Sequence, residues 1–296
     1  MATKREIGKP DYHWRFDSLE HWLKEAKPSP ANREEYRSAM DRGAGAKDWF
    51  GCDGPDTVNK YIHEGWPGGL KRIAAMRAKM TQSIPLFRKA RRRPYRSDQG
   101  DELDIHAVRS GNLDRAWRRM TKRHGRGSGK SRKVRVVMDI GGHAGCSADD
   151  LFWPPAASLA LCGRLVHLGY AVEIVASFAV DGFVRKPHQT GVFECVVKSF
   201  DRPYNPESFA ILALSGLFRT HGFGVLYSVE RRTCYGLGHH VPAESVAHLF
   251  KRDDATVIIT PSMRTERAAI KWLNDTLETQ GRTDADNAAD ERRATG

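Results

Sequence analysis

The feature that most constrains the fold of this chain is an alternation of strand-like and helix-like segments after residue 133. The apolar run VRVVMDI (134–140) precedes the helix-like segment PAASLALCGRLVHLGY (155–170). Later strand-like runs are AVEIVASFAV (171–180), GVFECVVKSFD (191–201) and ATVIITPS (255–262), with helix-like segments at 205–222 and 264–278. Apolar strands without two-residue alternation are typical of parallel sheets covered by helices. We therefore predict an α/β domain with a mostly parallel sheet over residues 133–278.

The sequence before residue 130 shows helical periodicity and no run of alternating β-branched residues. DSLEHWLKEA (17–26) repeats apolar residues at helical spacing behind a capping residue, and GNLDRAWRRMTKR (111–123) is predicted as a helix capped by Asn112. We therefore predict a helical N-terminal region over residues 1–124. The glycine- and serine-rich stretch 125–132 is predicted as a linker, and the polar stretch 279–296 as a disordered tail.

The positive charge of the chain is concentrated in one segment. Residues 88–135 contain 17 lysines and arginines against five acidic residues, a net charge of +12 that equals the formal net charge of the whole chain. Arginines that alternate with aromatic residues can contact phosphates and stack on unpaired bases. The basic segment 88–124 therefore predicts contact with RNA or single-stranded DNA, and a solvated connector is the alternative. The candidate nucleic-acid-binding residues are Arg91, Arg92, Arg93, Tyr95, Trp117, Arg118 and Arg119.

Composition and targeting signals indicate the class of protein. Hydrophobic residues make up 40% of the 296 positions, which is enough for a packed core. The first residues are polar, and the longest apolar tract is broken by charged residues, so we expect neither a signal peptide nor a membrane span. The five cysteines form no C-x-x-C pair and are expected to be reduced thiols. We therefore expect a cytoplasmic protein.

The glycine-rich loop after the first predicted strand, IGGHAG (140–145), matches neither common nucleotide-binding motif. Ile140 occupies the position of the first glycine in the dinucleotide-binding pattern G-x-G-x-x-G. HGRGSGKS (124–131) is close to a P-loop, but it precedes the strand, whereas a P-loop must follow one. The sequence also contains no G-x-S-x-G elbow for a nucleophilic serine. We therefore expect no nucleotide cofactor and favour a non-enzymatic protein.

The order of strand 134–140, long helix, hairpin strand and helix resembles a von Willebrand factor A domain, a Rossmann-like α/β fold. The resemblance covers residues 133–275 and implies a site at the top of the sheet. Members of that family hold a metal ion there through the pattern D-x-S-x-S and a later aspartate. The corresponding residues here are Asp139, Gly141 and His143, with Ser147 nearby and Asp201 in the place of the later aspartate.

This departure from the family pattern removes two hydroxyl ligands. Hard cations prefer several oxygen ligands, so the resemblance implies a degenerate site without metal. Asp139 and His143 are then expected to be exposed on a rim that binds a protein partner, together with Gly141, Ser147 and Asp201. A divalent metal ion held by Asp139, His143 and Asp201, in a metal-dependent hydrolase, is the alternative.

The chain is also similar to uncharacterised phage and prophage proteins that join an element like GDELDIHAVRSGNLDRAW (100–117) to such a domain. This resemblance implies a phage- or prophage-encoded protein in the cytoplasm of a bacterial host. The expected function is non-enzymatic binding of a protein partner through the rim. Nucleic-acid association through residues 88–135 is the second hypothesis.

Overall fold

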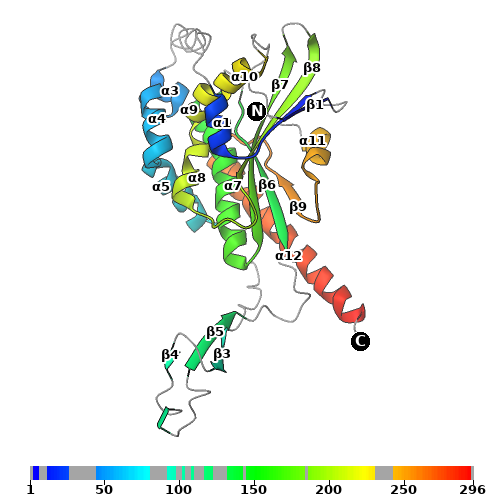
Figure 1. Ribbon diagram of the computed structural model, residues 1–296. Coiled ribbons are helices and arrows are strands. Elements are labelled where there is room, and N and C mark those ends of the chain that lie inside the picture. Colours follow the sequence, from blue (N-terminus) through cyan, green and yellow to red (C-terminus); the bar gives the residue numbers. More distant parts are fainter. Residues whose placement is uncertain are drawn as a thin grey trace. The chain divides into compact units, whose positions relative to one another are not determined.

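The computed structural model groups the chain into two compact units, which are described separately (Figure 1). The first contains residues 1–82 and 132–277, and the second contains residues 83–131 and 278–296. The residues whose structure is described are 3–6, 12–26, 45–80, 92–97, 102–103, 108–109, 117–122, 132–142, 145–183, 186–230 and 243–294. This grouping differs from the predicted domains, because residues 1–82 join the unit that carries the large sheet.

The first unit is built on a mixed, mostly parallel sheet with the strand order β1-β2-β8-β7-β6-β9. The pairs β2–β8, β6–β7 and β6–β9 are parallel, whereas β1–β2 and β7–β8 are antiparallel. The strands are β1 (Thr3–Glu6), β2 (Tyr12–Phe16), β6 (Lys133–Asp139), β7 (Ala171–Phe183), β8 (Lys186–Lys198) and β9 (Thr256–Ile259). The predicted α/β class with a mostly parallel sheet is therefore confirmed.

Helices cover both faces of this sheet. Val246 and Phe250 of α11 pack against Val137 and Val175 on one face. On the opposite face, Ser158 of α7 lies within hydrogen-bonding distance of Thr260, directly after β9. The helices of this unit are α1 (Leu19–Glu25), α3 (Ala46–Phe50), α4 (Pro55–Glu64), α5 (Pro67–Ala78), α7 (Ala148–Leu168), α8 (Pro206–Phe209), η2 (Ala210–Ala213), α9 (Ser215–Leu217), the π-helix η3 (Phe218–Gly222), α10 (Phe223–Glu230) and α11 (Ala243–Phe250), and α12 (Glu266–Ala294) begins in it.

Helix α7 begins seven residues before the predicted start at Pro155. The reason is a capping box: Ser147 Oγ accepts a hydrogen bond from the Asp150 amide at 3.1 Å, and the Asp150 carboxylate accepts one from the Ser147 amide at 2.9 Å. These bonds satisfy amides that the first turn leaves without helical partners, so the helix nucleates before its prolines. It ends at Gly169, whose φ of 95° lies in the left-handed region that favours glycine.

The predicted helical N-terminal region contains the helices α1, α3, α4 and α5, but it also contains two strands that we did not predict. Strand β2 lies beside β8 and buries Trp14 and Phe16, and the Trp14 indole stacks on Phe193 with ring centroids 4.5 Å apart. Aromatic residues at alternate positions of YHWRF are a strand pattern. The five-residue segment was too short for that pattern to stand out beside the neighbouring helical periodicity.

The second unit contains a small antiparallel sheet with the order β3-β5-β4. Its strands are β3 (Arg92–Ser97), β4 (Glu102–Leu103) and β5 (Trp117–Lys122). The predicted helix over 111–123 is therefore wrong for residues 117–122, because pairing with β3 overrides a weak helical propensity. The predicted disordered tail also differs, since α12 continues to Ala294. The linker residues 125–131 lie outside the described residues.

None of the described helices is by itself long and apolar enough to cross a membrane. One bent pair, Pro206–Ala213 with Ser215–Leu226, satisfies the length and composition criterion when its two parts are combined.

Candidate functional site

The large sheet has a topological switch point at β6. The chain continues from β6 through α7 to β7 on one side, and later returns to the other side as β9. Ligands of open α/β sheets bind outside the carboxyl ends of strands where the order reverses in this way. Of the predicted rim residues, Asp139 is the last residue of β6 and Gly141 and Ser147 follow it, so they lie at this edge, as do the residues after β9.

We predicted that Asp139 is exposed, but the structure shows that it is buried, with 2% of its surface exposed. Its Oδ1 accepts a hydrogen bond from the Gly141 amide at 2.9 Å, so the carboxylate stabilises the turn that follows β6. Gly142 is required by close packing, because an added Cβ would lie 2.0 Å from Cδ2 of Leu151. Ser147 is exposed but caps α7. His143 lies outside the described residues.

Asp201 does not join Asp139. Strand β8 is antiparallel to β7, with Lys198 opposite Ile174 and Glu194 opposite Ser177, so the residues after β8 emerge at the amino ends of β6 and β7. The neighbouring Phe200 ring accordingly lies 5.6 Å from Nζ of Lys133, at the start of β6. The length of β6 therefore separates Asp201 from Asp139, roughly 20 Å at the usual rise per residue.

The strand register places four polar residues in one row across the sheet. Arg15 of β2 is opposite Glu194 of β8, Glu194 is opposite Ser177 of β7, and Ser177 is opposite Asp139 of β6. Ser177 is fully buried and donates a hydrogen bond to the Phe193 carbonyl at 2.7 Å. We did not single out Ser177 or Glu194 from the sequence. The available signal was a polar residue in the middle of an apolar strand, which must find a partner when it is buried.

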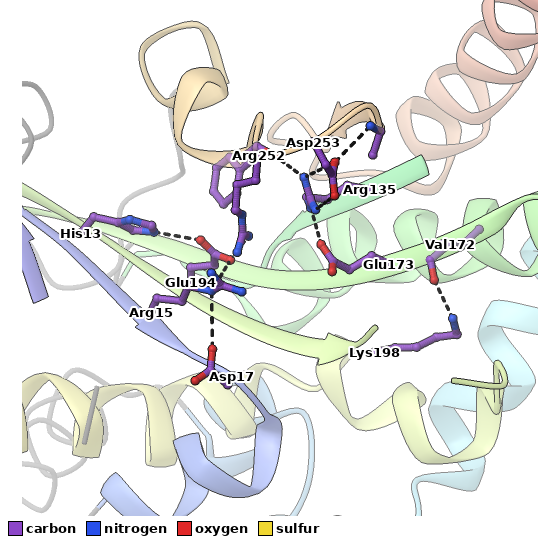
Figure 2. Close-up of polar contacts among 12 residues, drawn as sticks. His13, Arg15, Asp17, Arg135, Val172, Glu173, Glu194, Lys198, Arg252 and Asp253 are labelled. Carbon is purple, nitrogen blue, oxygen red and sulfur yellow. Dashed lines mark hydrogen bonds and ion pairs between the residues drawn. The ribbon is translucent and has the colours of Figure 1, made fainter. Parts of the chain in front are cut away.

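Glu194 is the centre of an ion cluster on the α11 face of the sheet (Figure 2). Its Oε2 lies 2.9 Å from Nε2 of His13, and its Oε1 lies 3.6 Å from Nε of Arg15 and accepts a hydrogen bond from Arg252. Burial alone raises the pKa of the Glu194 carboxyl, but the hydrogen bond with His13 and the charges of Arg252 and Arg15 outweigh it. The pKa therefore lies below its usual value.

Arg135 is the centre of a second cluster on the same face (Figure 2). It is 2% exposed, pairs with Glu173, and donates to Oδ2 of Asp253 at 3.0 Å and to the Phe250 carbonyl at 2.5 Å. Burial lowers the pKa of this guanidinium, but the hydrogen bonds with Glu173 and Asp253 outweigh that effect and raise it. The consecutive residues Arg252 and Asp253 thus connect the segment after α11 to Glu194 of β8 and Arg135 of β6.

A second buried arginine contacts the loop before α7. Arg219, on the π-helix η3, donates to the Trp49 carbonyl at 2.5 Å and to the Cys146 carbonyl at 2.6 Å, and its guanidinium carbon lies 3.9 Å from the centre of the Trp49 ring. Burial lowers its pKa to about 10. Short π-helical turns often occur at functional sites. No pattern in the sequence indicated that residues 218–222 form one.

The chemistry of the Glu194 and Arg135 clusters is that of buried ion pairs, in which Nε of Arg15 and Nε of Arg252 have no hydrogen-bond partner. Among the residues that the structure describes, no group of three or more His, Cys, Asp or Glu side chains could hold a metal ion. The three weak metal candidates are accordingly not brought together: Asp139 and Asp201 lie at opposite edges, and His143 is not described. Buried ion pairs of this kind connect the strands to the segment after α11.

The candidate nucleic-acid-binding residues fall mainly on the small sheet of the second unit. Arg92, Arg93 and Tyr95 lie on β3, whereas Arg91 lies outside the described residues. Trp117, Arg118 and Arg119 lie on β5.

The strand register of the small sheet gives the neighbours of these residues. It pairs Arg92 with Lys122, Arg93 with Thr121, Tyr95 with Arg119, Arg96 with Arg118, and Ser97 with Trp117. Strand β4 adds Glu102 opposite Arg118 and Leu103 opposite Trp117. Segments that are more than ten residues apart are thus brought into one sheet.

Comparison with known proteins identifies a family but no characterised relative. The profile of the family described as "Domain of unknown function (DUF7192)" matches residues 4–284. No curated protein and no solved structure matches the chain. The matched region includes both the large sheet and the small basic sheet, and on that basis the chain belongs to the DUF7192 family.

Proposed function

We propose that this protein binds nucleic acid through the basic face of the sheet β3-β5-β4. Residues that are opposite each other on neighbouring strands lie on the same face of a sheet. The pairs Arg92–Lys122 and Arg96–Arg118 are related by steps of two along each strand, so all four residues share one face, which we call the basic face.

The observation that carries the proposal is that both pairs have like charge. Like charges that are directly opposite each other destabilise an antiparallel pair. Glu102, opposite Arg118, provides one counter-charge for these four cations on the described strands. A polyanion that lies along the face would remove the repulsion, and phosphates are the partners that arginine binds best in a bidentate manner.

The charge distribution of the whole chain supports the same conclusion. Residues 88–135 carry a net charge of +12 and the remaining residues sum to zero. Six of the 17 cations of this segment lie on β3 and β5, and such a concentration of charge attracts polyanions over distances comparable with the Debye length, about 8 Å at physiological salt.

The test is a binding titration by fluorescence anisotropy with labelled DNA and RNA over a series of salt concentrations. The variant Arg96→Gln/Arg118→Gln removes one like-charged pair without introducing a new charge. The control Lys60→Gln/Lys71→Gln removes the same charge from exposed positions on α4 and α5.

The wild type should bind with a steep salt dependence. In the Arg96/Arg118 variant, the slope of log K against log salt should fall by about 0.7 to 0.9 for each lost phosphate contact. The control should retain the wild-type slope. Absence of binding near physiological salt, or an equal change in the control, would refute the proposal.

A second candidate function is protein binding at the switch point of the large sheet, favoured by the reversal of strand order at β6. The order β6, α7, β7, β8 with an antiparallel hairpin supports the resemblance to von Willebrand factor A domains. Because Asp139 is buried, we assign the contact surface to exposed residues at this edge, Ser147 and Ser262. The partner would lose affinity in Ser262→Glu but not in Arg202→Glu, a control at the opposite edge. Equal loss in both variants would contradict this assignment.

A further inference from the structure

We infer that the opposite face of the small sheet, which carries Tyr95 and Trp117, is a stacking platform for the unpaired bases of a single strand. This inference rests on the proposed function and specifies the class of nucleic acid. The positions that share this face are Arg93, Tyr95, Ser97, Leu103, Trp117, Arg119 and Thr121. We call it the aromatic face.

The register separates rings from most of the charge. Tyr95 is opposite Arg119, and Trp117 is opposite Ser97, two residues further along β3. Tyr95 and Trp117 are therefore diagonal neighbours, a relation that places Cα atoms about 7–8 Å apart in antiparallel sheets. Two aromatic positions at this spacing on one face suit two bases of a single strand.

The availability of base faces decides the class of partner. In a duplex the faces of the bases are stacked on one another and only their edges are accessible in the grooves. Aromatic side chains on a sheet can stack only on bases that are unpaired, as in single-stranded RNA and DNA. A surface used for duplexes alone would need the basic face and would not need the two rings.

The two arginines of the aromatic face support this inference. Arg119 is opposite Tyr95, and Arg93 lies two positions before Tyr95 on the same strand. Guanidinium groups next to rings contact the phosphates of a stacked strand and can stack on bases themselves. The aromatic face thus combines a salt-dependent contribution from Arg93 and Arg119 with a contribution from stacking that depends little on salt.

The experiment uses the full chain and four labelled probes: oligothymidine, oligouridine, and duplex DNA and RNA of equal length. The variant Tyr95→Ala/Trp117→Ala removes both rings, and the control Val108→Ala truncates an exposed apolar residue outside the strands of the small sheet. Affinities are compared over the salt series of the preceding experiment.

The expected result is loss of single-strand affinity by about tenfold for each ring removed, at every salt concentration and with an unchanged slope. Duplex affinity, and all affinities of the Val108→Ala variant, should stay near those of the wild type. The two single-stranded arms show whether RNA or DNA is preferred, since only RNA carries the 2′-hydroxyl.

A conservative variant protects the test against misfolding of the alanine variant. Tyr95→Phe/Trp117→Phe retains both rings and should keep at least half of the single-strand affinity. The wild type should also show quenching of tryptophan emission by oligothymidine that is absent in Trp117→Phe. Absence of this difference would overturn the inference whether or not the alanine variant folds.

The failure of this inference can be distinguished from the failure of the proposed function. Equal affinity for single strands and duplexes, unchanged by Tyr95→Ala/Trp117→Ala, would overturn the stacking platform and leave binding by the basic face intact. Absence of binding to all four probes would overturn both.

Discussion

Arg252 forms an ion pair with Glu194, whose side chain has no exposed surface, and the two residues are 58 positions apart in the chain. The pair joins the turn after α11 to a central strand of the large sheet. Adjacent Asp253 makes a corresponding pair with buried Arg135 of β6. Because these two consecutive residues carry opposite charges, each fits only its own partner, and the register of α11 on the sheet is fixed.

Removal of the Glu194 carboxylate should destabilise the protein strongly. Glu194→Gln removes the anion that Arg252 and His13 contact, while Arg15 keeps its pair with Asp17, and the loss of one partner from a buried pair costs about 3–5 kcal/mol. Urea unfolding at neutral pH measures the change. Glu64→Gln, which breaks an exposed pair with Lys60 on α4, should cost less than about 0.5 kcal/mol. Similar losses in both variants would contradict the central role of Glu194.

Acid should weaken the protein through the same carboxylate. The pKa of Glu194 is lowered in the folded state from the ordinary 4.5, so the unfolded chain binds its proton more readily. Its contribution to the free energy of unfolding is complete above the unfolded pKa and is lost as pH falls through the folded pKa. Urea unfolding between pH 7 and pH 3 should therefore show a decline that is shallower in Glu194→Gln. A decline of equal steepness in that variant would assign the acid sensitivity to other groups.

His221 should make stability depend on pH in a higher range. The half-buried imidazole lies on η3 with Nε2 3.0 Å from Oδ1 of Asn59, and burial lowers its pKa from 6.5 to about 4. Because the unfolded state binds the proton between these values, the free energy of unfolding should fall as pH drops from about 6.5 to about 4. His221→Asn should flatten the curve in this range, and an unaltered curve would contradict the assignment.

Close packing at Gly142 gives a prediction for the loop after β6. Gly142→Ala would place a Cβ against Leu151 of α7, and overpacking of this kind costs about 1–3 kcal/mol. Leu151→Ala should restore part of this loss in the double variant, because the clash is with that side chain. A double-mutant cycle measured by thermal unfolding gives the coupling energy. Strict additivity of the two effects would show that the glycine is needed for another reason.

The central strands were predictable because each combines high apolar content with clear boundaries. The runs 134–140, 171–180 and 191–201 all contain strands of the large sheet, and their helical connection α7 was recognised. Helix α7 was misplaced at its start because a capping box, not a proline, determines where it begins. Local signals of this kind are readable once the capping residues are considered.

Pairing between distant segments was not predictable from the pattern of one segment. Strand β5 has a sequence that is compatible with a helix, and its strand state depends on β3, more than twenty positions away. The position of Asp201 was wrong for a related reason: the antiparallel direction of β8 places the end of that strand at the opposite edge. Register and direction are properties of pairs of strands, so a single segment does not contain them.

The insertion of β2 beside β8 has a consequence during synthesis of the chain. His13 and Glu194 are 181 positions apart, so the aromatic strand leaves the ribosome long before its partner exists. At about 5–20 residues per second, this delay amounts to roughly 10–35 s. During that time Trp14 and Phe16 have no sheet to cover them, and an unpaired apolar strand is a site of aggregation. Nascent chains of this protein should therefore need a chaperone at their N-terminus until β8 has been translated.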